Sequence, residues 1–246
     1  MSSSTSIEKR AVVIGGSAGM GLATSRRLLG LGYEVWIVGR SQAKLAAAGA
    51  ELDHPNLKEA CVDASDLDAL TSFCRGLGQV DHVVLSAGGV SGACMAPFQE
   101  LKAEDLQKGF LDKFWMQFQV AQTLSSIIVP GGSLTFVTAI SAQLALPGTS
   151  GLAAINGAIE SMIRPMAKEL APKVRVNAVS PGVVETDWWS FMPESDRNAT
   201  FQHIASTLPM QRIGAPGDIA RVVEMLVENS FITGIVIPCD GGSHLG

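Results

Sequence analysis

Short runs of β-branched and other apolar residues alternate with segments of helical periodicity along the whole chain. The predicted strands are residues 11–15, 33–38, 58–62, 81–86, 133–138, 174–179 and 234–238, and the predicted helices are residues 19–30, 41–50, 66–77, 104–126, 150–170 and 216–228. Such alternation is typical of a parallel sheet with helices on both faces, and Val- and Ile-rich strands fit a sheet buried on both sides. We therefore expect an α/β fold: a doubly wound, seven-stranded parallel sheet of Rossmann type, in one domain over residues 1–246.

Composition excludes several classes of function. The net charge is −5 and no basic run exceeds two residues, so the chain lacks the electrostatic footprint of a nucleic-acid-binding protein. No apolar segment approaches the ~18 residues that span a bilayer, and the polar N-terminus does not resemble a signal peptide. The four cysteines form no CxxC pair and the four histidines are scattered, so we expect no metal site. These features predict a cytoplasmic protein that acts on a small molecule, away from membranes.

The first predicted strand runs directly into a glycine-rich turn, Gly15 to Gly21, and a helix follows at Leu22. Glycines allow positive φ angles and let the backbone approach a pyrophosphate, while the helix N-terminus offers free N–H groups to the anion. Because this turn follows a strand and opens a helix, it predicts a dinucleotide-binding site. The residues we expect to bind the phosphates are Gly15, Ser17, Gly19, Met20 and Gly21.

The second predicted strand ends at Gly39-Arg40-Ser41. An acidic residue at this point would accept hydrogen bonds from an adenosine ribose and favour NAD, but the chain has Arg40, nineteen positions after Gly21. A guanidinium can clamp a 2′-phosphate through paired charge-assisted bonds, and Ser17 and Ser41 can add hydroxyl donors. We therefore expect NADP rather than NAD; the alternative is a solvated arginine at the start of a helix.

The order of further motifs resembles the short-chain dehydrogenase/reductase family over nearly the whole chain. The glycine turn is similar to the family's TGGxxGxG with Ile14 in place of Thr, and the other matching motifs are Val62-Asp63, Leu85-Ser86-Ala87-Gly88 (family NNAG), Pro181 to Thr186 (family PGxxxT) and Asp240-Gly241-Gly242. The resemblance implies a homodimer or homotetramer and further cofactor contacts. It implies that Asp63 and Ala64 lie on the adenine side of the cofactor, and that Ala87 and Gly88 lie beside it at the central sheet. The residues that it implies on the nicotinamide side are Pro181, Gly182, Val184 and Thr186.

Members of this family usually reduce carbonyls with an Asn, a Ser, a Tyr and a Lys, and the Lys follows the Tyr by four residues. The only tyrosine of this chain, Tyr33, has Ile37 four positions later, so that pair is absent. Alignment without gaps between residues 146–148 and 175–177 places Leu152 at the Tyr position and Asn156 at the Lys position. It also places Ala139 at the Ser position and Lys113 at the Asn position. Ordinary ketone reduction would therefore need a different acid.

Two of these replacements are reciprocal. Lys113 stands where the family has Asn on one helix, and Asn156 stands where the family has Lys on the other. Lys113 shares a helix face with Leu106 and Val120, at spacings of seven, and Asn156 belongs to a stripe typical of a buried helix face. Our hypothesis is that Lys113 and Asn156 meet beside the nicotinamide ribose as catalytic residues. A buried ammonium would have a lowered pKa and could exchange a proton near neutrality. The alternative is that Lys113 reaches solvent from a helix edge.

Residues 183–210 form the longest stretch without a predicted strand. We expect a mobile substrate lid there, in which Trp188, Trp189, Phe191 and Met192 cover an apolar substrate; packing within or between subunits is the alternative. Thr138 and Ser141 are interpreted as structural hydroxyls at a strand end. The sequence favours an NADP-binding oxidoreductase with a non-standard active site for a small apolar carbonyl, enone or imine. A redox-inactive cyclase or isomerase, or a cofactor-binding partner or sensor, remains the alternative.

Overall fold

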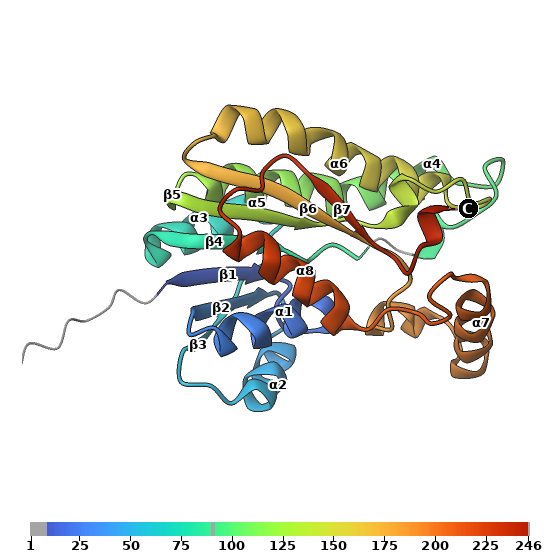
Figure 1. Ribbon diagram of the computed structural model, residues 1–246, viewed down its shortest axis with the longest axis horizontal. Helices are drawn as coiled ribbons and strands as arrows, with labels where there is room; N and C mark the ends of the chain where they lie inside the picture. The colour runs from blue at the N-terminus through green and yellow to red at the C-terminus, as the bar shows by residue number, and fades with distance from the viewer. Residues whose placement is uncertain (1–8, 90–91, 246) are drawn as a thin grey trace, which may run out of the picture.

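A computed structural model describes residues 9–89 and 92–245 of the chain. Within these residues, seven parallel strands form one sheet in the order β3-β2-β1-β4-β5-β6-β7 (Figure 1). The strands are β1 (Arg10–Ile14), β2 (Glu34–Gly39), β3 (Leu57–Cys61), β4 (Val80–Leu85), β5 (Ile128–Val137), β6 (Val174–Pro181) and β7 (Val236–Cys239). The predicted doubly wound α/β fold is confirmed.

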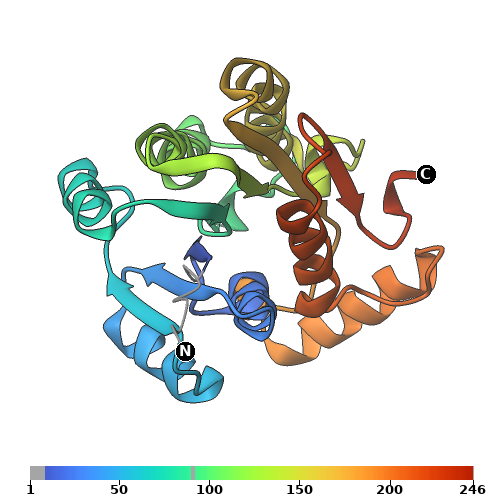
Figure 2. The same cartoon turned by 60° about the vertical axis from the view of Figure 1, so that its left-hand side comes forward.

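The helices form two layers, one on each face of the sheet (Figure 2). They are α1 (Gly19–Gly30), α2 (Gln42–Leu52), α3 (Leu67–Leu77), α4 (Ala103–Gly109), α5 (Met116–Ser125), α6 (Ser150–Leu170), α7 (Glu194–Thr207) and α8 (Pro216–Glu228). Buried residues of α1, α2 and α8 join one hydrophobic cluster with β1 and β2, whereas buried residues of α3, α5 and α6 join a second cluster on the other face. Both faces are therefore covered, which explains the continuous apolar strands. No helix of the described part of the chain is both long and apolar enough to cross a bilayer.

The strand register brings the carboxyl ends of four strands to one edge. Ile14 at the end of β1 pairs with Leu85 at the end of β4, which pairs with Phe136 of β5, and Val137 pairs with Val179 of β6. The chain order reverses between β1 and β4, and ligands of open α/β sheets bind at the carboxyl edge where this happens. The loops that leave this edge carry most of the residues singled out by the sequence.

Two segments differ from the sequence-based expectation. The predicted helix over 104–126 is interrupted by a π-helix, Phe110–Trp115, which separates α4 from α5. The strandless segment 183–210 contains a short 3₁₀ turn, Asp187–Phe191, and the helix α7, which was not predicted. Only Phe201 of α7 is buried, so this helix has no apolar stripe from which it could be predicted. In both ribbon views α7 lies outside the two helical layers, beyond α8.

Candidate active site

The glycine turn after β1 forms a backbone cradle at the carboxyl edge of the sheet. A Cβ built on Gly15 would come within 2.7 Å of the Ala87 nitrogen, and one on Gly16 within 2.9 Å of the Val13 oxygen. Gly15 and Gly19 also have φ angles of +82° and +51°. A side chain at these positions would fill the cradle or strain it. Gly15 and Gly16 are therefore required for the close approach of two backbone segments, and Gly19 for its positive φ.

Helix α1 begins inside this cradle at Gly19, followed by Met20 and Gly21. Its N-cap residue, Ala18, makes no side-chain cap, and the first turn carries no acidic residue. The first N–H groups of a helix need an acceptor, and an anion is a favourable one because the helix dipole is positive at this end. The end of α1 thus fits the pyrophosphate of a dinucleotide.

The end of β2 forms a corner beside the cradle. A Cβ built on Gly39 would lie 3.4 Å from Ser17 Oγ, so Ser17 sits next to the turn that carries Arg40 and Ser41. Arg40 is exposed, and its side chain can move to an incoming phosphate. Ser41 Oγ accepts from the Lys44 N–H and caps α2, so this hydroxyl has a structural role as well. The corner fits a 2′-phosphate on the adenosine ribose.

Asp63 and Ala64 follow β3 on the same side of the site. Asp63 Oδ1 accepts from the Ser65 hydroxyl at 2.6 Å and from the Ser65 N–H at 3.0 Å. These hydrogen bonds, with a smaller contribution from Arg40, hold the pKa of Asp63 below its usual value. Asp63 is therefore an ionised acceptor near the expected adenine position, while Ala64 packs against the sheet core.

The motif after β6 lies opposite the cradle. A Cβ built on Gly19 would be 3.3 Å from Thr186 Cγ2, so the two sequence motifs face each other across the site. Val184 is buried and forms an isolated bridge with Gly214, whereas Gly182 approaches Asp240 so closely that a Cβ would clash with its backbone. Pro181 ends β6 and is buried. These residues form a wall where the sequence places the nicotinamide.

Lys113 lies in the π-helix and is buried, with 8% of its surface exposed. Its Nζ donates to the Thr138 carbonyl oxygen at 3.3 Å, and its aliphatic stem lies against Gly88. Burial lowers the pKa of Lys113 from 10.5 to about 8, although the nearby Glu160 carboxylate acts in the opposite direction. Lys113 therefore does not reach solvent from a helix edge, and the inward-facing interpretation is correct.

Asn156 is also buried, one turn after Leu152 on α6. Its Nδ2 donates to Ser141 Oγ at 3.2 Å and to the Leu152 carbonyl at 3.0 Å, and its Oδ1 is buried without a partner. The expected direct contact with Lys113 is not among these bonds. Both side chains instead bind the turn from Thr138 to Ser141, Lys113 at the Thr138 oxygen and Asn156 at the Ser141 hydroxyl. Ala139 and Leu152 occupy the Ser and Tyr positions and offer no polar side chain.

Glu160 organises a polar network that the sequence analysis missed. Its carboxylate accepts from Thr138 Oγ1 at 2.8 Å, from Ser180 Oγ at 2.7 Å and from Gln143 Nε2 at 3.0 Å. Gln117 Nε2, one turn after Lys113, donates to the Ala87 oxygen at 2.7 Å and ties α5 to the loop after β4. A signal for both existed, since Glu160 follows Asn156 by four residues and Gln117 follows Lys113 by four.

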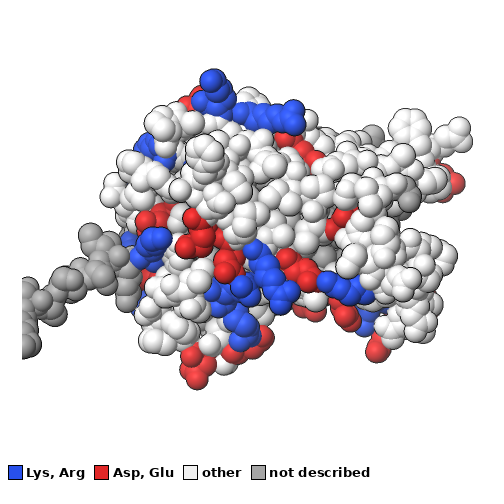
Figure 3. Space-filling model, viewed as in Figure 1, with Lys and Arg blue, Asp and Glu red and all other residues white. Residues whose placement is uncertain are grey.

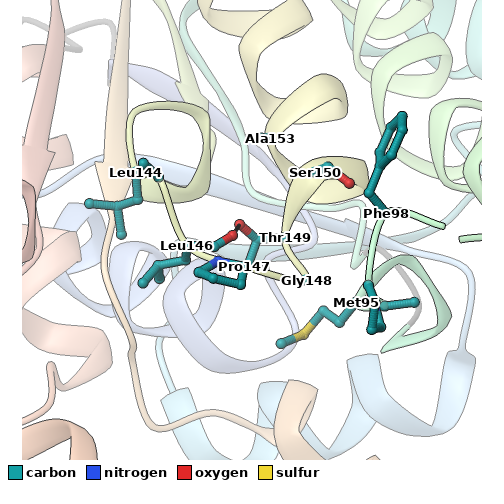
Figure 4. A pocket seen from close by; sticks show the side chains of 12 residues that line it. Met95, Phe98, Leu144, Leu146, Pro147, Gly148, Thr149, Ser150 and Ala153 are labelled. Atoms are coloured by element: carbon teal, nitrogen blue, oxygen red, sulfur yellow. Dashed lines mark hydrogen bonds between the residues drawn. The ribbon is translucent and has the colours of Figure 1, made fainter. Parts of the chain in front are cut away.

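An apolar cavity of about 770 Å³ lies where α6 begins, along the loop that follows the turn Ile140–Ala142 (Figure 4). Leu144, Leu146 and Pro147 lie on one side of it and Met95 and Phe98 on the other, while Ser150 and Ala153 come from the first turn of α6. Among the described residues, no charged side chain lines the cavity. Its volume is in the range of small-molecule sites, and its walls fit an apolar ligand. The described residues include no group of three or more His, Cys, Asp and Glu that could hold a metal ion.

The aromatic segment after the PGxxxT motif lies against the loop that follows β4. A Cβ built on Gly89 would be 3.2 Å from Trp188 Cδ1, and one on Gly92 would be 3.2 Å from Phe191 Cε2. Trp189 is anchored by a hydrogen bond from Nε1 to the Val184 oxygen at 3.1 Å and by an edge contact with Phe201 of α7. Trp189 is thus an anchor of the segment, while Trp188 and Phe191 border the site.

The cradle, the phosphate corner and the buried asparagine together fit a nicotinamide dinucleotide. The cradle positions exclude Cβ atoms, the α1 N-terminus lacks a cap, and the orphaned Asn156 Oδ1 is a buried acceptor suited to a ribose hydroxyl. Arg40 and Ser17 add the donors that a 2′-phosphate needs. The predicted site residues are therefore gathered at one edge of the sheet.

Comparisons with known proteins agree with this geometry. The family described as "Enoyl-(Acyl carrier protein) reductase" matches residues 15–244. The human 3-oxoacyl-[acyl-carrier-protein] reductase is 30% identical over 97% of this chain and 99% of its own length. A small-chain dehydrogenase solved in complex with NADPH is similar with a TM-score of 0.84 and 29% identity, covering 97% of this chain and all of that one.

A short-chain oxidoreductase from Pseudomonas aeruginosa is also similar, with a TM-score of 0.87 and 27% identity over 95% of this chain and 96% of that one. That protein was solved with NADPH bound and contains an atypical catalytic centre. The sequence matches, the strand order and the arrangement of the site extend over nearly the whole chain. This protein belongs to the short-chain dehydrogenase/reductase family.

Proposed function

We propose that this protein is an NADPH-dependent oxidoreductase in which Lys113 replaces the usual tyrosine as the proton donor. The observation that carries the proposal is the burial of the Lys113 ammonium, with a pKa of about 8, beside the turn that ends β5. A general acid works best when its pKa lies near the working pH, and Lys113 meets this condition where a normal lysine would not.

The cradle residues Gly15, Gly19, Met20 and Gly21 bind the pyrophosphate through backbone N–H groups, and Arg40 binds the 2′-phosphate. Bound NADPH supplies a hydride. Asn156 accepts a hydrogen bond from the nicotinamide ribose through Oδ1, because this atom is buried, unpartnered and held in place by the two bonds of Nδ2. Asn156 thereby takes over ribose binding, and Lys113 is left to exchange the proton.

The substrate is a small apolar carbonyl, enone or imine. Support comes from the cavity at the start of α6, whose described lining is apolar and uncharged and therefore favours a neutral, apolar compound. Trp188 and Phe191, which contact each other and the loop that follows β4, form a substrate lid together with residues 183–210. The π-helix around Lys113 supports a functional role for this segment, since such bulges cluster at functional sites.

The working protein is a homodimer or homotetramer. Support comes from exposed apolar residues near the edge strand β7, where Phe231 is 98% exposed and Ile235 is also exposed. Few charged side chains surround this edge in Figure 3. An exposed sheet edge with apolar neighbours favours association with a second copy. Light scattering of the purified protein, with Phe231→Glu as the comparison, tests this point.

The function is tested by cofactor titration followed by turnover. Thermal-shift titration with NADPH and NADH should show tighter binding of NADPH. NADPH consumption is then measured with cyclohexanone, cyclohexenone and pyrroline, for the wild type and for Lys113→Met. We expect consumption by the wild type and a loss of about a hundredfold or more in the variant, the scale of a removed general acid. Tight NADPH binding without any consumption would instead favour a redox-inactive protein.

A further inference from the structure

Ser141 carries a hydroxyl whose hydrogen is available to a ligand. It lies in the 3₁₀ turn Ile140–Ala142 directly after β5, two positions beyond Ala139, and its side chain is half-buried. Its Oγ accepts a hydrogen bond from Asn156 Nδ2 at 3.2 Å. Because this bond uses an oxygen lone pair, the hydroxyl hydrogen must point elsewhere. The interpretation of Ser141 as a purely structural hydroxyl therefore does not explain what accepts its hydroxyl hydrogen.

Asn156 holds this hydroxyl in one orientation. Both of its amide hydrogens are engaged, one with Ser141 Oγ and the other with the Leu152 carbonyl of the preceding helical turn. The other hydroxyl of the turn, that of Thr138, is already directed to Glu160 and to the Val179 oxygen. The hydroxyl hydrogen of Thr138 is thus used within the protein, whereas the bond from Asn156 leaves the hydroxyl hydrogen of Ser141 to be donated to a ligand.

Lys113 supplies a second donor at the same turn. Its ammonium has three hydrogens and donates one of them to the oxygen of Thr138, three residues before Ser141. The Glu160 carboxylate, which raises the pKa of Lys113, already accepts from Thr138, Ser180 and Gln143. The part of the cavity wall that the structure describes contains no acidic residue. A substrate oxygen that reaches this turn therefore meets two donors, and the positive charge of Lys113 is only partly balanced by Glu160.

We propose that Ser141 and Lys113 form a donor pair for a substrate oxygen, with Asn156 as the residue that positions Ser141. This inference rests on the proposed function and narrows its substrate class to carbonyls and enones. A protonated imine is a cation without a lone pair, so it would be repelled by Lys113 and could accept from neither donor. A carbonyl oxygen gains negative charge as the reaction proceeds, and preset donors stabilise that charge.

The atoms balance for a ketone in one step. The carbonyl carbon accepts the hydride of NADPH, the C=O π pair moves to oxygen, and the Lys113 ammonium transfers a proton to that oxygen. A C–H bond and an O–H bond form, the C=O π bond breaks, the substrate is reduced and NADPH is oxidised to NADP⁺. For an enone the hydride goes to the β carbon, the C=C π bond breaks and the negative charge develops on the same oxygen, which takes the Lys113 proton. The resulting enol then tautomerises, so that a C–H bond forms at the α carbon and the C=O bond is restored.

The first test compares Ser141→Ala, Ser141→Thr and the control Ser161→Ala, which removes an exposed hydroxyl from α6. Ser141→Ala should lower kcat with cyclohexanone or cyclohexenone about a hundredfold, the scale for one lost oxyanion donor, without changing NADPH affinity. Ser141→Thr keeps a hydroxyl and should restore most of the activity, whereas Ser161→Ala should match the wild type. Pyrroline should be a far poorer substrate than cyclohexenone at neutral pH.

The second test needs no turnover. Para-nitrophenol is titrated into the complex of the protein with NADP⁺, and its absorbance reports ionisation to the phenolate. In the wild type the bound phenol should ionise at a lower pH than in water; Ser141→Ala should reduce this shift, and Lys113→Met should reduce it further. Asn156→Ala should reproduce the Ser141→Ala shift, and NADP⁺ affinity is measured separately because Asn156 also serves the ribose.

The outcomes separate this inference from the proposed function. If no probe is reduced but the phenol shift is present and depends on Ser141, the redox proposal fails and the donor pair stands. If the wild type reduces ketones while Ser141→Ala leaves both kcat and the phenol shift unchanged, the donor pair is overturned and the redox proposal stands. An unshifted phenol in the wild type, or pyrroline turnover equal to that of cyclohexenone, also overturns the inference.

Discussion

Gly88 lies directly against Lys113: a Cβ built on Gly88 would be 2.9 Å from Lys113 Cγ and 3.1 Å from its Cα. The contact joins the loop after β4, which borders the dinucleotide cradle, to the π-helix that carries the buried ammonium. Because Gly88 also has a φ of +103°, no other residue fits this position without strain. The glycine of the cofactor motif thus fixes the depth at which Lys113 is buried.

The Gly88→Ala variant should therefore lose more activity than its loss of folding stability can explain. Its methyl group must push Lys113 away from Thr138, and a displacement of a catalytic group by about 1 Å can cost about a hundredfold in rate. The matched control is Gly32→Ala, which has a similar positive φ of +84° but no atom within 4 Å of the new Cβ. Both variants should lose about 1–3 kcal/mol of unfolding free energy, measured in urea, yet only Gly88→Ala should lose turnover. Equal turnover in the two variants would contradict the packing argument.

Activity should fall as the pH rises through about 8. Lys113 gives a proton only as the ammonium, and its pKa is about 8, so the active fraction decreases about tenfold per pH unit above that value. The measurement is kcat/KM against pH with NADPH and cyclohexenone. Lys113→Arg keeps the positive charge but cannot release a proton in this range, so its activity should be low and show no inflection.

The stability of the protein should increase with pH between about 8 and 10.5 through Lys113. Its pKa is lowered in the folded state, so the unfolded chain binds the proton more strongly in this interval and stability rises with pH. The burial cost is fully present below about pH 8 and is relieved by pH 10.5, on the order of 3 kcal/mol for a shift of this size.

Chemical denaturation of the wild type and Lys113→Met at several pH values isolates this contribution, because other groups titrate in both proteins. The difference in unfolding free energy between them should change in favour of the wild type as the pH rises from 8 to 10.5. A difference that stays constant would show that Lys113 has an ordinary pKa.

Glu160→Gln should move the activity profile to lower pH. The carboxylate raises the pKa of Lys113, so its removal lowers that pKa further and the ammonium is lost at a more acidic pH. The amide of Gln can still accept from Thr138 or Ser180, which limits the structural damage. Glu169→Gln, an exposed change on the same helix, is the control and should leave the profile where it is. A shift to higher pH in Glu160→Gln would contradict the electrostatic assignment.

Local motifs explain which parts of the site the sequence could predict. The glycine turn and the Arg40 corner depend on residues close together in the chain, and the structure places both at the carboxyl edge of the sheet. The spacing of seven between Leu106, Lys113 and Val120 also predicted correctly that Lys113 faces inward. Periodicity is informative here because the helix face is set by packing.

The remaining features depend on contacts between distant parts of the chain. Glu160 joins Thr138, which follows β5, to Ser180 of β6, and no single segment contains that arrangement. The π-helix at Lys113 has no local sequence pattern, and α7 lacks the apolar stripe by which helices are recognised. The hydrogen bonds of Lys113 and Asn156 run to the turn from Thr138 to Ser141, and spacing along the two helices could not predict that turn as their common partner.

Reversing the charge at Arg40 should invert the cofactor preference. In Arg40→Glu the carboxylate repels a 2′-phosphate but can accept from the two ribose hydroxyls of NADH, so NADPH affinity falls and NADH affinity rises. The loss for NADPH should be about ten- to hundredfold, the equivalent of about 1.5–3 kcal/mol for a charged hydrogen bond. Arg75→Glu makes the same charge change at an exposed site on α3 and should leave the ratio of the two affinities unaltered. Fluorescence titration with both cofactors measures that ratio, and an unchanged NADPH preference in Arg40→Glu would show that other residues hold the 2′-phosphate.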